Sequence, residues 1–522
     1  MPRRERRRVA AVEAVGPYSL LRLERGGLEP GVPGQFFMLE APGRLLPRPM
    51  SLCLAPPGEL AFLVDPIGPG TRALCSLAVG AEITVLGPLG NGFRLDVERP
   101  LLVGGGIGMA PLPYLSAVLG HPPALLGFRS AWHAEAARLL PDAEVVIEPT
   151  LVTELLSSDP GDVLACGPEP MLVALRCLVP GAQLAWEAAM ACGYGACHGC
   201  AVEIHGGLRR LCVEGPVLGG APPLERRVLV PTRSRAAAGE LPLLLNASGC
   251  LDALMAPEVA CSLDAYVTKT VTPLPREGNP PVRIAETAAG LINSIGLANP
   301  GIAAFCEHVL PELACLGVPI WVSVGGFGAG EYAASCSLLD ADDAVAAIEL
   351  NLSCPNVDGA PESAAQIVAA CRAATTKPLW AKLSPATPDI GAAAQAVEAA
   401  GADGLSLVNT LRGLALDERT LRPRLGTGAG AGGLSGPPLK HVALAAVDAC
   451  ARATTLPIVG MGGVSTGRDA LELLVAGASA VALGTVLFAD PQAPARVRDE
   501  LLAESPFREI QSVERPEALT RA

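Results

Sequence analysis

Short apolar runs alternate with longer stretches rich in Ala and Leu through the second half of the chain. Each run has the length of a buried strand, and the intervals between runs leave room for helices. Eight such runs occur, at Leu243–Leu245, Ala265–Val267, Ile320–Val324, Ala347–Leu350, Leu379–Lys382, Gly404–Val408, Pro457–Val459 and Ala480–Leu483. The pattern predicts a (β/α)₈ barrel, the TIM barrel.

Before residue 97 the apolar runs are shorter, partly alternating and broken by Gly and Pro, as in Phe36–Leu39 and Ile83–Leu86. This pattern predicts a small antiparallel β-barrel. Within it, Arg48-Pro49-Met50-Ser51 offers a guanidinium and a hydroxyl to a flavin ring edge and a pyrophosphate. Gly68-Pro-Gly70-Thr71 offers close backbone approach and a hydroxyl to a phosphate. Each stretch alone is also compatible with an ordinary turn.

A different pattern starts near residue 98, where a buried strand from Leu101 runs into the loop Gly104-Gly105-Gly106-Ile107-Gly108 and then into an apolar helix. A second strand, Asp162–Ala165, ends in Cys166-Gly167-Pro and begins another helix. A lone glycine loop is weak evidence. Two strand–loop–helix units together predict an α/β nucleotide-binding domain.

Four cysteines follow that domain: Cys192, Cys197, Cys200 and Cys212. Their spacing is close to the plant-type pattern in which four thiolates hold one [2Fe–2S] cluster. Interspersed glycines let the backbone fold tightly around such a cluster. Structural zinc and ordinary buried thiols are alternatives, but zinc sites usually show two paired C-x-x-C knuckles. The spacing therefore favours the cluster.

Composition limits the classes of function. The net charge of −13 argues against a nucleic-acid partner. The basic N-terminal run lacks the apolar core of a signal peptide, and the uncharged span Leu101–Phe128 contains too many Gly and Pro residues for a membrane helix. Sixteen cysteines without a secretory signal indicate a reducing compartment, so we expect a cytoplasmic protein without membrane association.

Polar residues follow the predicted barrel strands, at the end where TIM barrels place their active sites. These residues are Ser248, Lys269, Asn351, Lys382, Asn409, Gly462-Gly463 and Gly484-Thr485. The two glycine turns after strands seven and eight suit a ribityl phosphate. Lys382, one of only four lysines, could balance the negative charge that builds on a flavin ring.

The stretch Asn351-Leu-Ser-Cys354-Pro-Asn356 combines a thiol with two amides. Amides offer paired donors and acceptors to a flat imide-containing ring. Cys354 could be only a small buried hydrophobe. Its place between the two Asn residues suggests instead a proton acceptor that its surroundings must activate.

The order of motifs in the first half resembles the electron-transfer subunit of class 1B dihydroorotate dehydrogenases, over roughly residues 10–218. Those are ferredoxin-reductase-like proteins with FAD and a two-iron cluster. The resemblance implies that FAD is held by Arg48, Pro49, Ser51, Gly70 and Thr71. It implies that NAD faces Gly104, Gly105, Gly106 and Gly108, with Cys166 and Gly167. The family usually carries an Asp-Gly-Ser segment after Val145–Ile147, and its absence leaves an acceptor other than NAD as an alternative.

The second half resembles the catalytic subunit of class 1 dihydroorotate dehydrogenases from about Leu243 to Phe488. The matching stretches include Val267-Thr-Lys269-Thr270, Asn293-Ser-Ile295-Gly296-Leu297, Asn351 to Val357 and Val408-Asn409-Thr410. The family implies FMN held by Ala247, Ser248, Lys269, Thr270, Asn351, Lys382, Gly462, Gly463, Gly484 and Thr485. It implies substrate held by Lys269, Asn293, Ile295, Gly296, Leu297, Asn351, Asn356, Asn409 and Thr410. It implies Cys354 as the base, with Lys269 and Lys382 as further catalytic residues.

Together these features predict two usually separate subunits fused in one chain. The expected parts are an FAD-binding β-barrel (1–97), a shortened NAD-binding α/β domain (98–182), a 2Fe-2S domain (183–222), a linker (223–240) and an FMN-binding TIM barrel (241–522). The resemblance implies oxidation of dihydroorotate to orotate in pyrimidine biosynthesis, with electrons passing from FMN through the cluster and FAD to NAD. It also implies a homodimer of the fused chain.

Two alternatives stay open at this point. A dihydropyrimidine dehydrogenase-like reductase shares the barrel and the cysteine but usually has His-Gly where this chain has Asn356-Val357. A non-enzymatic electron carrier on a decayed barrel is the other. Retention of Lys269, Cys354 and Lys382 in a lysine-poor chain speaks against decay.

Overall fold

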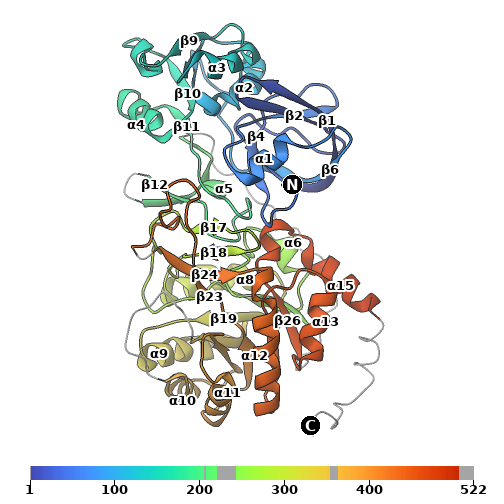
Figure 1. Ribbon diagram of the computed structural model, residues 1–522. Helices are drawn as coiled ribbons and strands as arrows, with labels where there is room; N and C mark the ends of the chain where they lie inside the picture. The colour runs from blue at the N-terminus through green and yellow to red at the C-terminus, as the bar shows by residue number, and fades with distance from the viewer. Residues whose placement is uncertain (1, 205–206, 220–242, 353–362, 429, 505–522) are drawn as a thin grey trace. The chain divides into compact units, whose positions relative to one another are not determined.

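The computed structural model describes residues 2–204, 207–219, 243–352, 363–428 and 430–504. Among these, residues up to 219 form one compact unit, apart from the short loop 196–198, and residues from 243 form a second. Figure 1 shows the helices and strands of both units. The predicted linker 223–240 lies outside the described residues.

The first unit opens with a six-stranded antiparallel sheet that curls into a near-barrel (Figure 1). In the order of pairing its strands are β4 (Arg48–Ser51), β3 (Phe36–Leu39), β6 (Glu82–Leu89), β1 (Arg3–Val15), β2 (Tyr18–Glu24) and β5 (Glu59–Val64). Phe37 and Phe62 pack edge to face in its core, with ring centroids 5.6 Å apart. Helix α1 (Pro69–Cys75) follows β5. The predicted antiparallel barrel is confirmed.

A parallel sheet with one antiparallel edge strand completes most of this unit. Its order is β14 (Val217–Leu218), β11 (Gln183–Ala185), β10 (Asp162–Cys166), β7 (Pro100–Gly105), β8 (Ala124–Phe128) and β9 (Glu144–Ile147). The connections contain α2 (Leu112–Leu119), α3 (Ala131–Ala134), α4 (Glu169–Leu178) and 3₁₀ turns at Gly106–Met109, Glu135–Leu139 and Val152–Leu155. Because β7 and β10 are neighbours, with Cys166 opposite Gly104, the two predicted nucleotide loops leave the same edge of the sheet.

The cysteine-rich segment lies between the last strands of this sheet. Strands β12 (Ala201–Ile204) and β13 (Gly207–Arg210) pair antiparallel, and α5 (Leu211–Glu214) follows directly. Cys212 therefore sits on α5, whereas Cys200 directly precedes β12.

The second unit is built on an eight-stranded parallel sheet. Its order is β15 (Leu244–Asn246), β26 (Ala480–Leu483), β25 (Ile458–Met461), β22 (Gly404–Leu407), β21 (Leu379–Leu383), β20 (Val345–Asn351), β19 (Ile320–Val324) and β16 (Tyr266–Val267). A bridge between Leu245 and Ala265 joins the first strand to the last, so the barrel closes. All eight predicted strands are present, and the TIM barrel is confirmed.

Helices surround this barrel (Figure 1). They are α6 (Pro257–Ala260), α7 (Ile302–Ala304), α8 (Leu310–Ala314), α9 (Ala329–Asp340), α10 (Ala364–Ala374), α11 (Ile390–Ala399), α12 (Lys440–Ala453), α13 (Gly467–Val475), α14 (Val486–Ala489) and α15 (Ala493–Ala503), with a π-helical turn at Phe305–Val309 and a 3₁₀ turn at Pro437–Leu439. Inside the barrel, the rings of Trp321 and Trp380 pack with centroids 4.6 Å apart. A Cβ at Gly404 would lie 2.4 Å from the Trp380 ring, so this glycine makes room for the tryptophan.

A second sheet, which the sequence pattern does not predict, belongs to the barrel unit. Its antiparallel strands pair in the order β17 (Ile284–Glu286), β18 (Leu291–Asn293), β24 (Ala431–Ser435) and β23 (Leu411–Leu414). In Figure 1 it lies beyond one end of the barrel. Asn293 ends β18 and pairs with Gly433 of β24, so this sheet carries a residue predicted to bind substrate.

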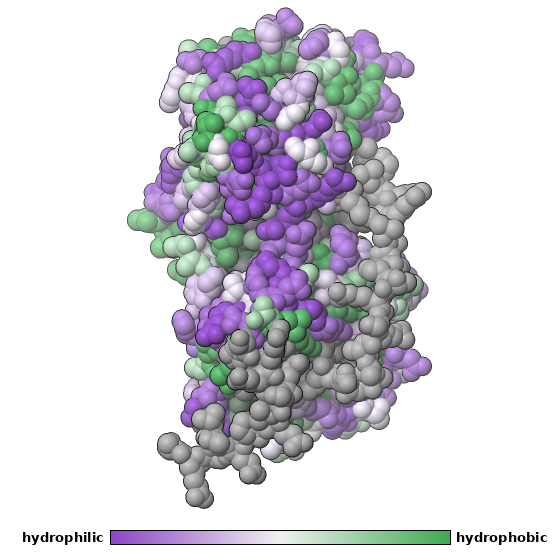
Figure 2. All heavy atoms as spheres, turned by 90° about the vertical axis from the view of Figure 1, so that its right-hand side faces the viewer, coloured by the Kyte–Doolittle hydropathy of each residue, from purple (hydrophilic) through white to green (hydrophobic). Residues whose placement is uncertain are grey.

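No helix among the described residues combines the length and apolar character needed to cross a bilayer. On the face shown in Figure 2, hydrophilic residues predominate and apolar residues are scattered among them.

Candidate functional site

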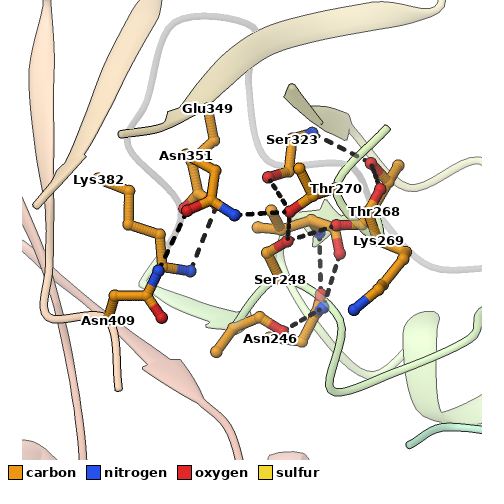
Figure 3. A network of polar contacts seen from close by, with 12 residues as sticks. Asn246, Ser248, Thr268, Lys269, Thr270, Ser323, Glu349, Asn351, Lys382 and Asn409 are labelled. Carbon is orange, nitrogen blue, oxygen red and sulfur yellow. Dashed lines mark hydrogen bonds and ion pairs between the residues drawn. The ribbon is translucent and has the colours of Figure 1, made fainter. Parts of the chain in front are cut away.

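A connected polar network occupies the carboxyl ends of the barrel strands (Figure 3). Thr270 is its centre. The Thr270 hydroxyl lies 3.3 Å from the hydroxyl of Ser248 and 3.1 Å from that of Ser323. It also accepts a 3.1 Å hydrogen bond from the side-chain amide of Asn351, whose carbonyl oxygen accepts one of 3.1 Å from Asn409. Residues from several strands are thereby held as one unit.

The two lysines predicted at this site differ in their surroundings. Lys382 is 5% exposed, and its Nζ lies 3.4 Å from Oε1 of Glu349 inside the barrel. The Lys269 side chain lies over Gly249, where an added Cβ would approach its Nζ to 3.0 Å. Gly249 has a φ of +76°. A side chain there would therefore strain the backbone and displace the lysine.

The glycine turns after β25 and β26 differ in their backbone conformation and in the space around them. Gly462 and Gly463 have φ values of +128° and +76°, which L side chains rarely adopt. An added Cβ at Gly484 would meet nothing closer than Ala247 Cβ at 3.6 Å, so the protein itself leaves space there. Thr485 donates a 2.8 Å hydrogen bond to Ser435. The space at Gly484 and the backbone at Gly462-Gly463 fit a bound phosphate.

The predicted substrate residues lie on the second sheet of this unit, β17–β18–β24–β23, and on the barrel loops. Asn293 donates a 3.1 Å hydrogen bond to the carbonyl of Gly433, and a Cβ at Gly433 would lie 2.1 Å from the Thr410 hydroxyl. Leu297 has a φ of +56°, a strained conformation for a branched side chain. Cys354 and Asn356 lie outside the described residues.

Ile295 and Gly296 complete the predicted substrate loop. Gly296 has a φ of +75°, and a Cβ there would lie 2.4 Å from the side-chain oxygen of Asn279. The carbonyl of Gly296 accepts a 3.3 Å hydrogen bond from Arg276. This loop is therefore held in a tight turn that only glycine permits at its centre.

In the first unit, the structure brings the two predicted FAD motifs together. An added Cβ at Gly70 would lie 2.1 Å from Nε of Arg48, so the guanidinium lies against the first turn of α1. Pro49 and Ser51 share strand β4 with Arg48. The Thr71 hydroxyl accepts a 3.1 Å hydrogen bond from the amide of Gly68 and thereby fixes the start of α1. A guanidinium beside such a turn suits a pyrophosphate.

The predicted nucleotide loops are also adjacent. A Cβ at Gly108 would lie 2.4 Å from the Cα of Gly167, so the two backbones touch. Burial raises the pKa of the Cys166 thiol, which keeps it protonated and unreactive. Arg129, missed in the sequence, follows β8 and donates a 2.7 Å hydrogen bond to the buried His133. No sequence pattern singled out that pair.

The four predicted cluster cysteines are all buried. The Sγ atoms of Cys200 and Cys212 lie 3.2 Å apart, and the backbone amide of Cys212 points at Cys200 Sγ across 3.4 Å. Hydrogen bonding to Cys192 and Cys200, together with burial, raises the pKa of Cys212, whereas the contact with Cys212 lowers the pKa of Cys200. Gly193 and Gly195, with φ of +77° and +96°, turn the backbone around the thiols.

The donor set therefore fits an iron–sulfur cluster: the four thiols are buried, Cys212 on α5 meets Cys192 and Cys200 of the glycine-rich loop, and an amide points at one sulfur. Among the described residues, no group of three or more His, Cys, Asp or Glu side chains is arranged to hold a single metal ion. A two-iron cluster differs from such a site because each iron takes only two of the four thiolates.

Several members of the barrel network were missed by the sequence reasoning: Asn246, Thr268, Ser323 and Glu349. Asn246 donates to the Val267 carbonyl across 2.7 Å and accepts from its amide across 2.9 Å, which ties β15 to β16. Glu349 lies two positions before Asn351 on a buried strand, so both side chains face the barrel interior. That spacing was a usable signal.

A closed parallel barrel with lysines and amides at its carboxyl end, joined in one chain to a buried four-cysteine loop, defines an iron–sulfur flavoprotein oxidoreductase. Residues 242–504 match the dihydroorotate dehydrogenase family, and residues 187–221 match the iron–sulfur cluster binding domain of dihydroorotate dehydrogenase B. The chain belongs to the dihydroorotate dehydrogenase family and carries the iron–sulfur domain of the B-type enzyme ahead of the catalytic domain.

Relatives match the catalytic half. The catalytic subunit of dihydroorotate dehydrogenase B (NAD(+)) from Listeria welshimeri is 45% identical over 253 residues, which is 47% of this chain and 81% of that protein. The subunit from Desulforudis audaxviator is 46% identical over 258 residues, 48% of this chain and 83% of that protein. A Solibacter usitatus protein assigned to dihydroorotate dehydrogenase A (fumarate) is 45% identical over 247 residues, 46% and 81% of the two chains.

Among solved structures, the Eimeria tenella DHODH complex with ferulenol is 25% identical, with a TM-score of 0.42 over 50% of this chain and 80% of that chain. Family membership implies FMN in the barrel, where the open turn at Gly484 fits its phosphate, and an iron–sulfur cluster on the cysteine loop.

Proposed function

We propose that this chain oxidises dihydroorotate to orotate in the barrel and passes the electrons through the iron–sulfur cluster and FAD to NAD. The observation that carries the proposal is the joined amide pair of Asn351 and Asn409, anchored on Thr270 at the carboxyl end of the strands. Fixed amides there offer the donors and acceptors that a flat imide ring requires.

The residues of the chain then have distinct tasks. Asn293, Asn351, Asn409 and Thr410, with the loop Ile295 to Leu297, orient the substrate, and Asn356 joins them by resemblance. Lys269 holds the substrate beside the flavin, and Cys354 takes the proton from C5. FMN bound at this face would supply the acceptor for the hydride from C6.

FMN would be held by residues at the same face: Ala247, Ser248, Lys269, Thr270, Asn351, Lys382, Gly462, Gly463, Gly484 and Thr485. The mutual contacts of Ser248, Thr270 and Asn351 support this assignment, because one network then serves both substrate and cofactor. Lys382 contributes a buried positive charge near the region where negative charge develops.

NAD as the acceptor is supported by two features. The catalytic halves from Listeria and Desulforudis belong to enzymes named for NAD(+). The contact between Gly108 and Gly167 brings two nucleotide loops together. The short connection after β9 and the fumarate-type name of the Solibacter relative favour a second candidate, the same oxidation with another acceptor.

The assembly and the domain limits are also proposals. We infer a homodimer of the fused chain, because the resemblance implies two copies of each subunit. The five parts keep the proposed limits 97, 182, 222 and 240. The limit at 97 falls between β6 and β7, which belong to different sheets, whereas β11 pairs with β10, so the parallel sheet extends past the limit at 182.

The test is anaerobic mixing of the purified chain with dihydroorotate and NAD while flavin and NADH absorbance are followed together. Flavin bleaching with NADH formation, both abolished by Cys354→Ala, is the expected result. Flavin bleaching without NADH formation would mean that the electrons pass to an acceptor other than NAD. If dihydroorotate bleaches no flavin, the proposed oxidation is wrong.

A further inference from the structure

Glu349 is a carboxylate in the barrel interior that no predicted role uses. Its side chain is 1% exposed, and its strand neighbours in register are Ser323 of β19 and Trp380 of β21. The ring of Trp380 packs against that of Trp321, so the Glu349 carboxylate lies next to a pair of aromatic rings. Removing a carboxylate from water is costly, so a buried charge without a partner at this position would be unfavourable.

Lys382 compensates that charge. Its Nζ lies 3.4 Å from Glu349 Oε1, and this is the one ion pair that Glu349 makes within the described part of the chain. Lys382 is opposite Asn351 in the strand register, so its stem starts at the level of the amide network (Figure 3). Glu349 lies two residues before Asn351 on β20, and its carboxylate fixes the position of the Lys382 ammonium through this ion pair.

The neighbouring strand on the other side of Lys382, β22, shows why the ion pair with Glu349 matters. Ser406 of β22 is in register with Lys382 and fully buried, and its hydroxyl has no hydrogen-bond partner among the described residues. An ammonium released from Glu349 could bond to that hydroxyl, on the strand that flanks β21 on the side away from β20. The pair with Glu349 therefore selects one of two positions for the lysine.

We propose that Glu349 is a positioning residue of the oxidation, which fixes the Lys382 ammonium where it acts on the bound flavin. The inference rests on the proposed function, since it takes the flavin-side role of Lys382 from there. A fixed cation aimed at developing charge needs no reorganisation during reaction, whereas a mobile one does.

The test uses flavin bleaching by dihydroorotate under anaerobic single-turnover conditions, corrected for FMN content. Glu349→Gln should slow bleaching by about 100-fold, because a displacement near 1 Å can cost that much. Glu349→Asp, which keeps the charge, should recover most of the loss. In a Lys382→Met background, Glu349→Gln should slow bleaching no further, since its effect passes through the lysine.

A second readout does not need dihydroorotate. The ratio of oxidised to reduced flavin against a reference dye should shift toward the oxidised form by about tenfold in Glu349→Gln, because displacement of the ammonium outweighs the loss of the carboxylate's negative charge. In the Lys382→Met background no ammonium can be displaced, so the same substitution should leave only the direct charge effect, a shift toward the reduced form. The melting temperature should fall in Lys382→Met, which leaves Glu349 unpaired, and recover in the double variant.

Asp490→Asn is the matched control, because Asp490 is 6% exposed and pairs with Arg496 across 2.9 Å away from the network. It should lower the melting temperature and leave bleaching unchanged. The proposal is overturned if Glu349→Gln lowers only the melting temperature, or if it slows bleaching equally with and without Lys382. If the wild-type chain is not bleached by dihydroorotate, the proposed function fails and the dye ratio alone decides the role of Glu349.

Discussion

Asn409 donates a 3.1 Å hydrogen bond from its side-chain amide to the side-chain carbonyl of Asn351. The two residues follow different barrel strands, and Asn351 in turn donates to Thr270. Each amide is thereby fixed with one orientation of donor and acceptor. A planar substrate meets a surface whose hydrogen-bonding pattern is set before it binds.

Replacing Asn409 tests this relationship. Asn409→Ala removes the donor and leaves the buried carbonyl of Asn351 without its partner, so kcat/KM for dihydroorotate should fall about 10- to 100-fold. Steady-state kinetics with a fixed acceptor measure the effect. Gln395→Ala on α11 is the control, because within the described part of the chain the side chain of Gln395 bonds only to the carbonyl of Ala453 at the end of α12. Equal kcat/KM values for the two variants would contradict the assigned role.

A substitution in the cysteine loop should block electron transfer to NAD without affecting flavin reduction in the barrel. Cys200→Ser should remove the visible iron–sulfur absorption and the bound iron, because Cys200 is buried and its sulfur contacts both the thiol and the backbone amide of Cys212. Dihydroorotate should still bleach FMN, whereas NADH formation should fall to background. Cys53→Ser is the control, since Cys53 is equally buried in the same unit but packs in a hydrophobic cluster with Ala61 and Leu63 that contains none of the four cluster cysteines. Retained iron in Cys200→Ser would contradict the cluster assignment.

The space at Gly484 makes a further prediction. Gly484→Ala adds a Cβ that meets the protein only at ordinary contact distance, so the stability of the apoprotein should be unchanged. The same methyl group enters the space assigned to the FMN phosphate, so FMN affinity should fall at least about tenfold. Fluorescence titration of apoprotein with FMN measures this. Unchanged affinity would place the phosphate elsewhere.

Most of the fold could be predicted because its signals are local. The eight barrel strands are continuous apolar runs, and the strand–glycine–helix order of β7 and β10 is readable residue by residue. The sheet β17–β18–β24–β23 was missed since its strands are three to five residues long, and β24 contains Gly432 and Gly433. Its central pair, β18 with β24, joins residues more than a hundred positions apart, which no local pattern encodes.

The candidate site, like the fold, could be predicted in part from local signals. Asn351, Lys382 and Asn409 stand at strand ends, where the barrel topology itself gathers them. Ser323 was missed because a hydroxyl inside a strand is informative only once its partner is known. The inward direction of Glu349 could have been inferred from its spacing with Asn351, but its partner Lys382 is known only from the structure. The tail after Phe488 carries no motif, yet it forms α15, where Arg496 pairs with Asp490 and Glu500.

Asp340 makes the stability of the barrel unit depend on pH. It ends α9 and accepts 2.6 Å hydrogen bonds from the Thr375 hydroxyl and the Thr376 amide, just before β21. These bonds favour the ionised form and lower the pKa of Asp340 from 3.8 to about 2. A carboxyl whose pKa is lower in the folded state adds stability above its unfolded pKa and loses it as the pH falls.

The contribution of the Asp340 charge should therefore be complete at neutral pH and disappear between about pH 4 and pH 2. Asp340→Asn keeps an acceptor oxygen and removes only the charge. The melting temperature of this variant should be lower than that of the wild type at neutral pH, and the difference should narrow through the acidic range. A difference that stays constant down to pH 2 would mean that the hydrogen bonds, and not the charge, link α9 to β21.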